Sequence, residues 1–162
     1  MNILIAPALG VVGLLAALVV FSLVMRYSDG TDQVKKIGDE IHKGAMKFMK
    51  TEYTYLLIFV LVLVVLVATF LSIQSAIAVV VGAACSSLAG FIGMYAATKA
   101  NVRTATAAQQ DGAAAALSVS FYGGSVMGLC VASLGLIGLG GLFYFFSETH
   151  VHALEGFGMG AS

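Results

Sequence analysis

The chain has 162 residues, of which 60% are hydrophobic and only 10% are charged, and its mean hydropathy is +1.00. A soluble domain carries about 25% charged residues, so this composition excludes a globular domain with a water-facing surface. Eight basic residues balance eight acidic ones, and the zero net charge excludes the cationic field that draws proteins to nucleic acid. We therefore expect an integral membrane protein that contacts the lipid bilayer and has no nucleic-acid partner.

The first apolar segment, residues 3–25, contains no charged side chain. About 20 apolar residues suffice to cross the roughly 30 Å hydrocarbon core of a bilayer. A cleavable signal peptide would need a basic start and a shorter apolar core, and this segment has neither. We expect a membrane span at about 3–25 that remains in the mature protein.

The polar connection 26–54 contains an amphipathic pattern. The stretch 29–32, Asp-Gly-Thr-Asp, supplies turn and N-cap chemistry in front of it. The pattern predicts a cytoplasmic amphipathic helix that lies on the membrane or docks on neighbouring helices. A lipid-sensing role is the alternative, although charges on such a helix usually stay solvated. The apolar residues that share one helix face are Val34, Ile37, Ile41, Ala45 and Phe48.

The uncharged interval 53–98 is about twice as long as one span requires. The chain must therefore fold back within it, and the only polar interruption is a Ser, a Gln and a second Ser at 72–75. We predict a second span at about 55–71 and a third at about 76–98, joined by a tight turn.

A second polar connection at 99–111 precedes the last uncharged interval, 112–147. This interval is too long for one perpendicular helix and too short for two spans with a turn. We expect one long helix, whose Ala-rich start projects beyond the headgroups and whose membrane part covers about 119–146.

Small residues recur at helical spacings in the third and fourth spans. Apolar side chains gain nothing by leaving the lipid tails, whereas small residues allow helix backbones to approach closely, so these spans are expected to pack against other helices. Cys85 and Cys130 lie in the same apolar stretches without the spacing of a disulfide scaffold, and we interpret them as apolar core residues. The small residues are Gly82, Ser86, Ala89, Gly90, Gly93 and Ala97 in the third span, and Gly124, Gly128, Gly135, Gly138, Gly140 and Gly141 in the fourth.

All eight Lys and Arg residues lie in the connections 26–54 and 99–111. The positive-inside rule places such connections in the cytoplasm. Four spans then leave both ends of the chain outside. We therefore expect a multi-pass, all-α membrane protein, and we assign it to the inner (plasma) membrane of a prokaryotic cell.

No span contains a charged side chain, although an intramembrane charge is the usual sign of an ion pathway. The spans alone therefore cannot form a proton relay or a cation site. The Gly156-x-Gly158-x-Gly160 run follows no predicted strand, so we interpret it as a loop or the start of another helix, not as a nucleotide-binding motif. The carboxylates all lie in connections or at helix ends: Asp29, Asp32, Asp39, Glu40, Glu52, Asp111, Glu148 and Glu155.

Two small polar groups remain as candidate sites. His150 and His152 could ligate a metal if a third ligand came from elsewhere, but a polar outer loop is the simpler interpretation. A second group at the cytoplasmic end of the third span can bind a phosphate or cap the last carbonyls, although anchoring the span is the simpler interpretation there. Its members are Lys99, Asn101, Arg103 and Thr104.

Four stretches carry the motifs that identify a family: GMYAATKANVRTA at 93–105, GGSVMGL at 123–129 with GL at 135–136, and GFGMGAS at 156–162. The first connection adds a weaker set, which consists of Gly30-Thr31-Asp32, Ile37, Ile41, Gly44-Ala45, Phe48 and Glu52-Tyr53. Together these residues resemble the membrane-bound pyrophosphatases, almost continuously and in order over 26–162.

That resemblance implies a homodimeric ion pump that couples hydrolysis of pyrophosphate on several Mg²⁺ ions to export of protons or sodium ions. It further implies that the four spans belong to the outer ring of a larger helical bundle, and that the substrate, magnesium and gate residues lie beyond Ser162. On this basis we expect the chain to be an N-terminal fragment, truncated at its C-terminus, with no catalytic, substrate-binding or metal-binding residue of its own. The alternative is a stand-alone four-helix membrane scaffold or channel subunit without enzymatic activity.

Overall fold

The structure is a computed structural model that describes residues 4–146 and 154–162. Four of the helices in these ranges are long and apolar enough to cross a membrane. The expected all-α integral membrane fold with four membrane helices is confirmed. The helices in chain order are α1 (Ile5–Met25), α2 (Asp32–Phe70), α3 (Ile73–Gln110), α4 (Ala113–Phe146) and the short α5 (Glu155–Ala161).

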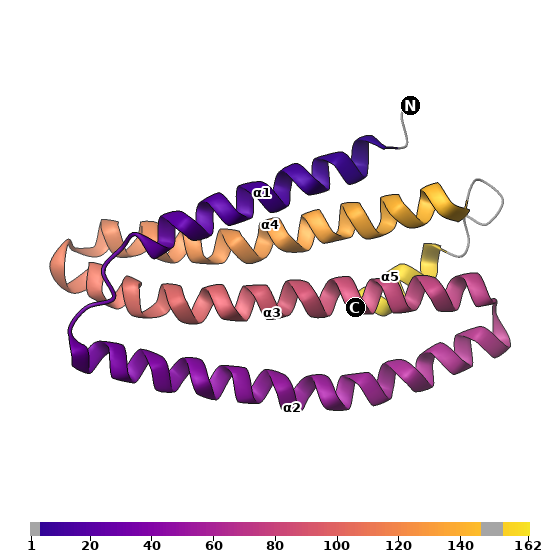
Figure 1. Ribbon diagram of the computed structural model, residues 1–162, viewed down its shortest axis with the longest axis horizontal. Coiled ribbons are helices and arrows are strands. Elements are labelled where there is room, and N and C mark those ends of the chain that lie inside the picture. The colour runs from indigo at the N-terminus through magenta and orange to yellow at the C-terminus, as the bar shows by residue number, and fades with distance from the viewer. Residues whose placement is uncertain (1–3, 147–153) are drawn as a thin grey trace.

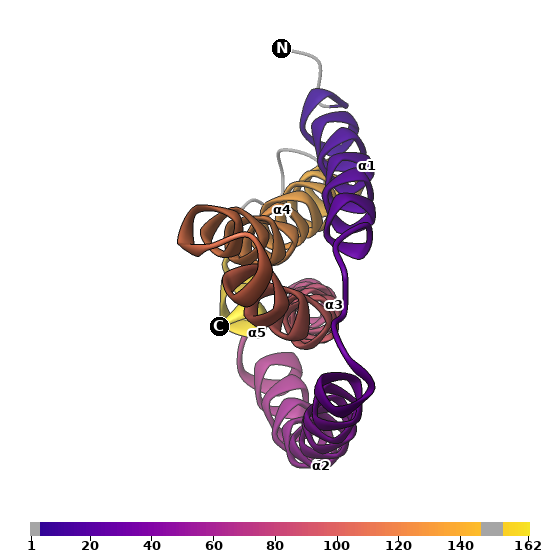
Figure 2. The ribbon, with the colours of Figure 1, turned by 90° about the vertical axis from the view of Figure 1, so that its left-hand side faces the viewer.

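The four long helices lie side by side in the order α1, α4, α3, α2 (Figure 1, Figure 2). Helix α4 packs against both α1 and α3, whereas α2 packs chiefly on α3. Helices α1 and α2, although consecutive in the chain, therefore lie at opposite edges of the row (Figure 2). The short helix α5 packs against α3, toward the end where α2 turns into α3 (Figure 1).

The amphipathic segment expected within 26–54 is not a separate helix. It forms the first half of α2, which runs without a break into the apolar second half. No Gly or Pro occurs after Gly44 in this helix. The hydroxyls of Thr51 and Thr54 donate to carbonyls four residues earlier, so they follow the helix instead of capping it. The helix continues because the sequence offers its backbone no other partner.

The apolar face predicted for this segment, expected either on the membrane or against a neighbouring helix, is mostly exposed: only Val34 and Ala45 are half-buried. Ile37 and Phe48 are 62% and 58% exposed, and Ile41 is exposed as well. The side of α2 that packs on α3 instead carries Gly38 and Met49, both of which are buried. Glycine adds nothing to a hydrophobic pattern but allows close approach of two helices, so the periodicity of apolar residues identified the neighbouring face.

Two tight connections join α2 to α3 and α3 to α4. Ser72 is the N-cap of α3, and its hydroxyl accepts a hydrogen bond of 3.0 Å from the backbone N–H of Ser75. Between α3 and α4 only Asp111 and Gly112 intervene. Gly112 has a φ of +89°, a left-handed conformation that favours glycine. The connection expected at 99–111 is therefore almost wholly helical.

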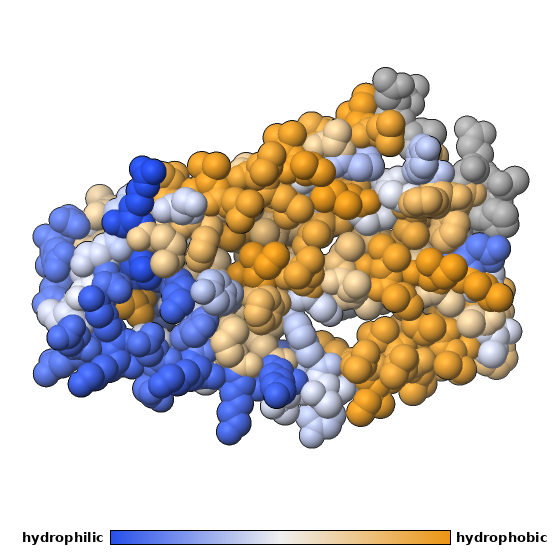
Figure 3. Space-filling model, viewed as in Figure 1, coloured by the Kyte–Doolittle hydropathy of each residue, from blue (hydrophilic) through white to orange (hydrophobic). Residues whose placement is uncertain are grey.

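The surface divides into a polar end and an apolar remainder (Figure 3). Hydrophilic residues gather over the first half of α2 and the neighbouring ends of α3 and α4, which Figure 1 shows on the same side of the molecule. Hydrophobic residues cover most of α1 and the second half of α2 (Figure 3). Such a division is typical of a membrane bundle with one end outside the hydrocarbon core.

Small side chains build much of the interior. Ala96 and Cys130 belong to a buried cluster between α1, α3 and α4, and Cys130 is 2% exposed. Cys85 is half-buried and lies at the edge of a second cluster around Phe157 of α5. Both thiols are free. The interpretation as an apolar core residue is confirmed for Cys130, while Cys85 packs at the periphery.

Only some of the glycines expected at helix interfaces meet a neighbouring helix. A Cβ atom built on Gly93 would lie 2.6 Å from Cγ of Met127, and one built on Gly138 would lie 2.7 Å from the Phe157 ring. Four others have no such neighbour within 4 Å in the described part of the chain, so their α4 positions face open space here. These four are Gly124, Gly128, Gly135 and Gly141.

Candidate functional site

The candidate phosphate-binding group lies in the last turns of α3, where the structure splits it in two. Lys99 and Arg103 are four residues apart and share one side of the helix. They line a cavity toward the α1–α2 connection. Asn101 and Thr104 line a different cavity, toward α4. The four residues therefore do not form one site.

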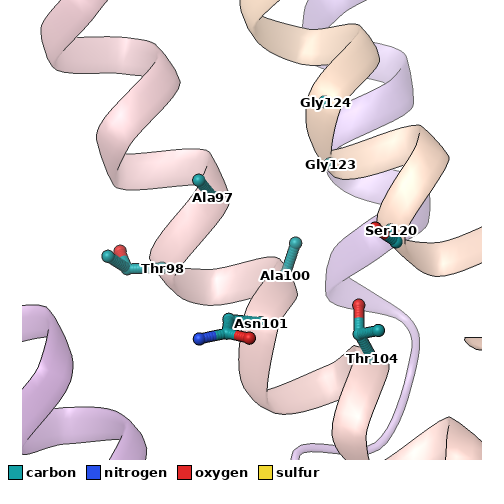
Figure 4. A pocket seen from close by; sticks show the side chains of 8 residues that line it. All are labelled: Ala97, Thr98, Ala100, Asn101, Thr104, Ser120, Gly123 and Gly124. Carbon is teal, nitrogen blue, oxygen red and sulfur yellow. The ribbon is translucent and has the colours of Figure 1, made fainter.

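The α3–α4 cavity has a volume of about 410 Å³ (Figure 4). Its polar lining residues are Asn101, Thr98, Thr104 and Ser120, although the Thr98 hydroxyl points away from α4 and bonds to His42 of α2 (Figure 4). Thr104 points toward the turn of α4 that carries Ser120 (Figure 4). The lining holds no charged side chain, so this cavity supplies no charge-assisted hydrogen bond to a phosphate. The remaining lining residues are Ala97, Ala100, Gly123 and Gly124.

The second cavity, here called the α2–α3 cavity, has a volume of about 260 Å³ and a strongly charged lining. It collects residues from the α1–α2 connection, from the start of α2 and from the end of α3. Absence of a side chain at Gly38, which lies against Val102, allows α2 to approach α3 at this point. The lining residues are Met25, Asp29, Lys35, Gly38, Asp39, Thr98, Lys99, Val102 and Arg103.

The charges of the α2–α3 cavity are only partly paired. Lys35 Nζ lies 3.2 Å from Asp29 Oδ1. The hydrogen bond from Lys35 holds the pKa of Asp29 below its usual value, and the nearby positive charge of Arg103 acts in the same direction. Arg103 is 8% exposed, and its Nη1 donates a 2.9 Å hydrogen bond to the carbonyl of Lys99. Its buried Nε has no hydrogen-bond partner within the part of the chain that the structure describes.

A polar contact beside this cavity attaches α2 to α3. His42 Nδ1 lies 2.8 Å from Thr98 Oγ1, and the same hydroxyl donates to the carbonyl of Tyr95. A hydroxyl has one proton, so the Nδ1–H of His42 donates to Thr98. The His42 ring also stands edge-on to Tyr95, with 5.1 Å between ring centroids. Sequence reasoning missed this contact, because nothing local connects residues so far apart in the chain.

The glycine run 156–160 serves helix packing. It lies within α5, which confirms the interpretation as the start of another helix. A Cβ on Gly156 would collide with the carbonyl of Ser75, and one on Gly160 with the carbonyl of Val79. The two glycines, one turn apart, thus allow the backbone of α5 to approach that of α3.

The described residues contain no group of three or more His, Cys, Asp or Glu side chains that could hold a metal ion. The two histidines considered as metal ligands, His150 and His152, lie outside the described residues. The absence of catalytic and metal-binding residues from this chain therefore stays a prediction.

The sequence matches a family model and several known proteins over almost its whole length. A family model described as "Inorganic H+ pyrophosphatase" matches residues 11–162. The chain is 41% identical over 153 residues to a putative K(+)-stimulated pyrophosphate-energized sodium pump of Clostridium tetani, which covers 94% of this chain and 22% of that protein. It is 38% identical over 164 residues to K(+)-insensitive pyrophosphate-energized proton pump 2 of Moorella thermoacetica, which covers 98% of this chain and 24% of that protein.

A third relative, the K(+)-insensitive pyrophosphate-energized proton pump of Methanosarcina mazei, is 33% identical over 159 residues, with 97% of this chain and 23% of that protein covered. The chain thus spans about a quarter of the length of the relatives that it matches.

Proposed function

The chain belongs to the family of inorganic H⁺ pyrophosphatases, and on this premise we propose that it is the N-terminal part of a pyrophosphate-energised ion pump. In the complete pump, hydrolysis of pyrophosphate drives export of H⁺ or Na⁺ across the membrane. The observation that carries the proposal is the match along almost the whole chain to relatives whose names state this activity.

We assign a structural role to this part of the pump. The stretches 5–25, 53–98 and 112–146 contain no Asp, Glu, Lys or Arg. Hydrolysis of a polyanion relies on metal ions and cationic groups held close together, and these stretches cannot supply them. Their small residues support close packing against further helices, and the family resemblance assigns α1 to α4 to the outer ring, around the helices that carry catalysis.

The complete pump is proposed to use Mg²⁺, and the residues described here do not fit that ion. Magnesium prefers carboxylates together with substrate phosphates. The carboxylates of the described residues are dispersed, and none of them joins a metal-binding group. The ligands are therefore assigned to the rest of the pump, together with the residues that bind pyrophosphate.

The membrane orientation and the partners belong to the same proposal. The connections that hold every Lys and Arg face the cytoplasm, in the inner membrane of a prokaryotic cell, and the N-terminus and the α2–α3 turn face outward. Helix α5 runs parallel to α3 from that outer end, since Gly156 lies beside Ser75 and Gly160 beside Val79. The partners are the remaining helices of the same pump and, in a homodimer, a second copy.

Phosphate release from magnesium pyrophosphate tests the proposed activity. The 162-residue chain and the protein extended along its genomic reading frame are reconstituted in liposomes, with an empty-vector preparation and a fluoride control. We expect fluoride-sensitive hydrolysis from the extended protein and none from the chain alone. Hydrolysis by the chain alone would contradict the structural role. A stop codon after Ser162 in a sound genome assembly would favour the stand-alone four-helix scaffold.

Labelling of single cysteines tests the orientation. Lys43→Cys on the polar half of α2 and Leu71→Cys at the α2–α3 turn are placed in a background in which Cys85 and Cys130 are replaced by Ala. Both positions are exposed. We expect an impermeant thiol reagent to reach them from opposite sides of sealed vesicles, and labelling from the same side would reject the orientation.

A further inference from the structure

Arg103 presents a buried charge for which the described residues offer no acid within salt-bridge distance. The ion pairs found among residues 4–146 and 154–162 join Lys35 to Asp29 and Lys43 to Glu40, and neither includes Arg103. An arginine stays protonated at every physiological pH, so the charge cannot be relieved by titration. Asp29, whose pKa the charge of Arg103 helps to lower, is already ion-paired with Lys35. A buried charge without an acid in direct contact costs several kcal/mol, so a further anionic partner would stabilise this guanidinium.

The guanidinium also has hydrogen-bonding capacity to spare. Arginine carries five N–H donors, and the one hydrogen bond found for Arg103 runs from Nη1 to the carbonyl of Lys99. That bond holds the side chain along α3, while Nε stays buried and unpaired in the described part of the structure. Because Nε is shielded from solvent, an oxyanion in the cavity would accept from the terminal Nη groups of this fixed, planar guanidinium.

The α2–α3 cavity, which Arg103 lines, has a net positive lining. Three cations, Lys35, Lys99 and Arg103, face two carboxylates, Asp29 and Asp39. The pair between Lys35 and Asp29 at 3.2 Å neutralises one charge of each sign. One excess positive charge remains, which matches the single negative charge of a phosphate diester.

The position of the cavity relates it to the membrane surface. Met25, the last residue of α1, lines it. Lys99 and Arg103 are the first charged residues after the uncharged interval on α3. Both boundaries mark the level at which hydrocarbon gives way to headgroups on the basic side of the bundle. Basic pockets between helices at this level bind phospholipid headgroups.

From these observations we infer that the α2–α3 cavity binds a phosphate group between Arg103 and Lys99. The charge balance and the depth favour the phosphate diester of an anionic phospholipid over free inorganic phosphate. The remaining apolar lining, Met25 and Val102, suits the glycerol and ester region of such a lipid. The site is independent of the pyrophosphate chemistry proposed above.

Native mass spectrometry of the protein at the length that its gene encodes, purified in mild detergent, tests this inference. The protein is mixed with vesicles of phosphatidylglycerol or of phosphatidylcholine, or with inorganic phosphate alone. We expect one tightly bound phosphatidylglycerol per chain and an affinity about tenfold lower in Arg103→Gln and Lys99→Gln, the size expected for one charge-assisted hydrogen bond. Arg26→Gln is the matched control, because Arg26 is exposed at the same level and does not line the cavity.

Each comparison of variants and ligands either supports or overturns the proposed phosphate site. Loss of phosphatidylglycerol in both cavity variants, but not in Arg26→Gln, supports it with the lipid as the source. Displacement of the lipid by inorganic phosphate, or specific binding of phosphate alone, supports it with free phosphate as the source. Equal retention by the cavity variants and the control, or equal binding of phosphatidylcholine, overturns it. Should Arg103→Gln not fold, the half-buried Lys99→Gln carries the same comparison.

Discussion

Helices α2 and α3 have almost the same length, 39 and 38 residues, but very different surroundings. In the most apolar stretch of α2, 6% of the residues are buried, whereas 33% are buried in the less apolar spanning stretch of α3. The more apolar of the two spanning stretches is thus the less buried one. In lipid, a large apolar side chain gains nothing by leaving the tails, so burial follows the small size of residues instead of their hydrophobicity.

The contacts between the two helices show the same principle. At the polar end, Gly38 of α2 lies against Val102 of α3. Farther along, the Tyr53 hydroxyl donates a 2.5 Å hydrogen bond to the carbonyl of Ser87. Near this bond lies another cavity between the two helices, distinct from the charged α2–α3 cavity, with a volume of about 370 Å³. Figure 1 shows α2 bowing away from α3 in its middle part. Small residues, a few polar contacts and the buried cluster of Val67 with Ala76 and Val79 therefore hold α2 in place.

The largest effect is expected when a small buried residue on α3 is enlarged, in contrast to the reduction of a large exposed residue on α2. A Cβ on Gly82 would collide with the carbonyl of Phe157, which is backbone and cannot rotate away. We expect Gly82→Leu to lower the free energy of unfolding by about 3 kcal/mol or to prevent assembly. Leu61→Ala, at a position 56% exposed, is expected to change it by less than about 0.5 kcal/mol. Thermal unfolding in detergent measures both effects. Equal melting temperatures of the two variants would reject the claim that small residues on α3 stabilise the bundle more than large residues on α2.

Gly93 and Gly90 give a graded version of the same test. A Leu at Gly93 would press on the flexible side chain of Met127, and we expect a loss of about 2 kcal/mol. At Gly90 the added Cβ of a Leu would meet the Tyr53 hydroxyl at 3.1 Å and no other neighbouring atom within 4 Å, so we expect a cost of about 1 kcal/mol. Gly128→Leu on α4 is the control, because no neighbouring atom lies within 4 Å in the described residues. A loss from the control as large as from Gly93→Leu would contradict the ranking.

Tyr53→Phe tests how much the hydrogen bond between α2 and α3 contributes to stability. The variant keeps the ring but removes the hydrogen bond to Ser87, so we expect a loss of about 1 kcal/mol in unfolding free energy. Tyr55→Phe removes the same hydroxyl from a residue that is 71% exposed and should have no measurable effect. Chemical denaturation of the two variants side by side gives the difference.

The smallest effect is expected at the start of α2, where Asp29 pairs with Lys35. The folded-state pKa of Asp29 is lowered from 3.8, mainly by the hydrogen bond from Lys35. Its stabilisation is therefore present above pH 3.8 and is lost as the pH falls through the lower folded-state pKa. Both side chains are 45% exposed, so we expect Asp29→Asn to cost less than about 0.5 kcal/mol at pH 7. At pH 2 the difference in unfolding free energy between Asp29→Asn and the unchanged protein should shrink. A constant difference at both pH values would show that the ion pair with Lys35 is not its cause.

Much of the fold follows from the distribution of charge along the chain. An uncharged interval twice the length of a span must turn back, and Ser72 supplies the N-cap at which it does so. The single long helix α4 follows from the length of its uncharged interval in the same way. The sequence also shows that Lys99 and Arg103 share a helix side, because four residues make about one turn.

Other features were decided only when the helices packed together. Periodicity placed Ile37, Ile41 and Phe48 on one helix face but left open whether that face meets the membrane or a neighbouring helix; the face that packs on α3 carries Gly38, which no hydrophobic pattern can detect. Likewise, nothing near Arg103 in sequence shows that Asp29 and Lys35 will line its cavity. In lipid there is no general driving force that turns an apolar face inward, so size, shape and polar contacts between distant segments decide which sides of the helices meet.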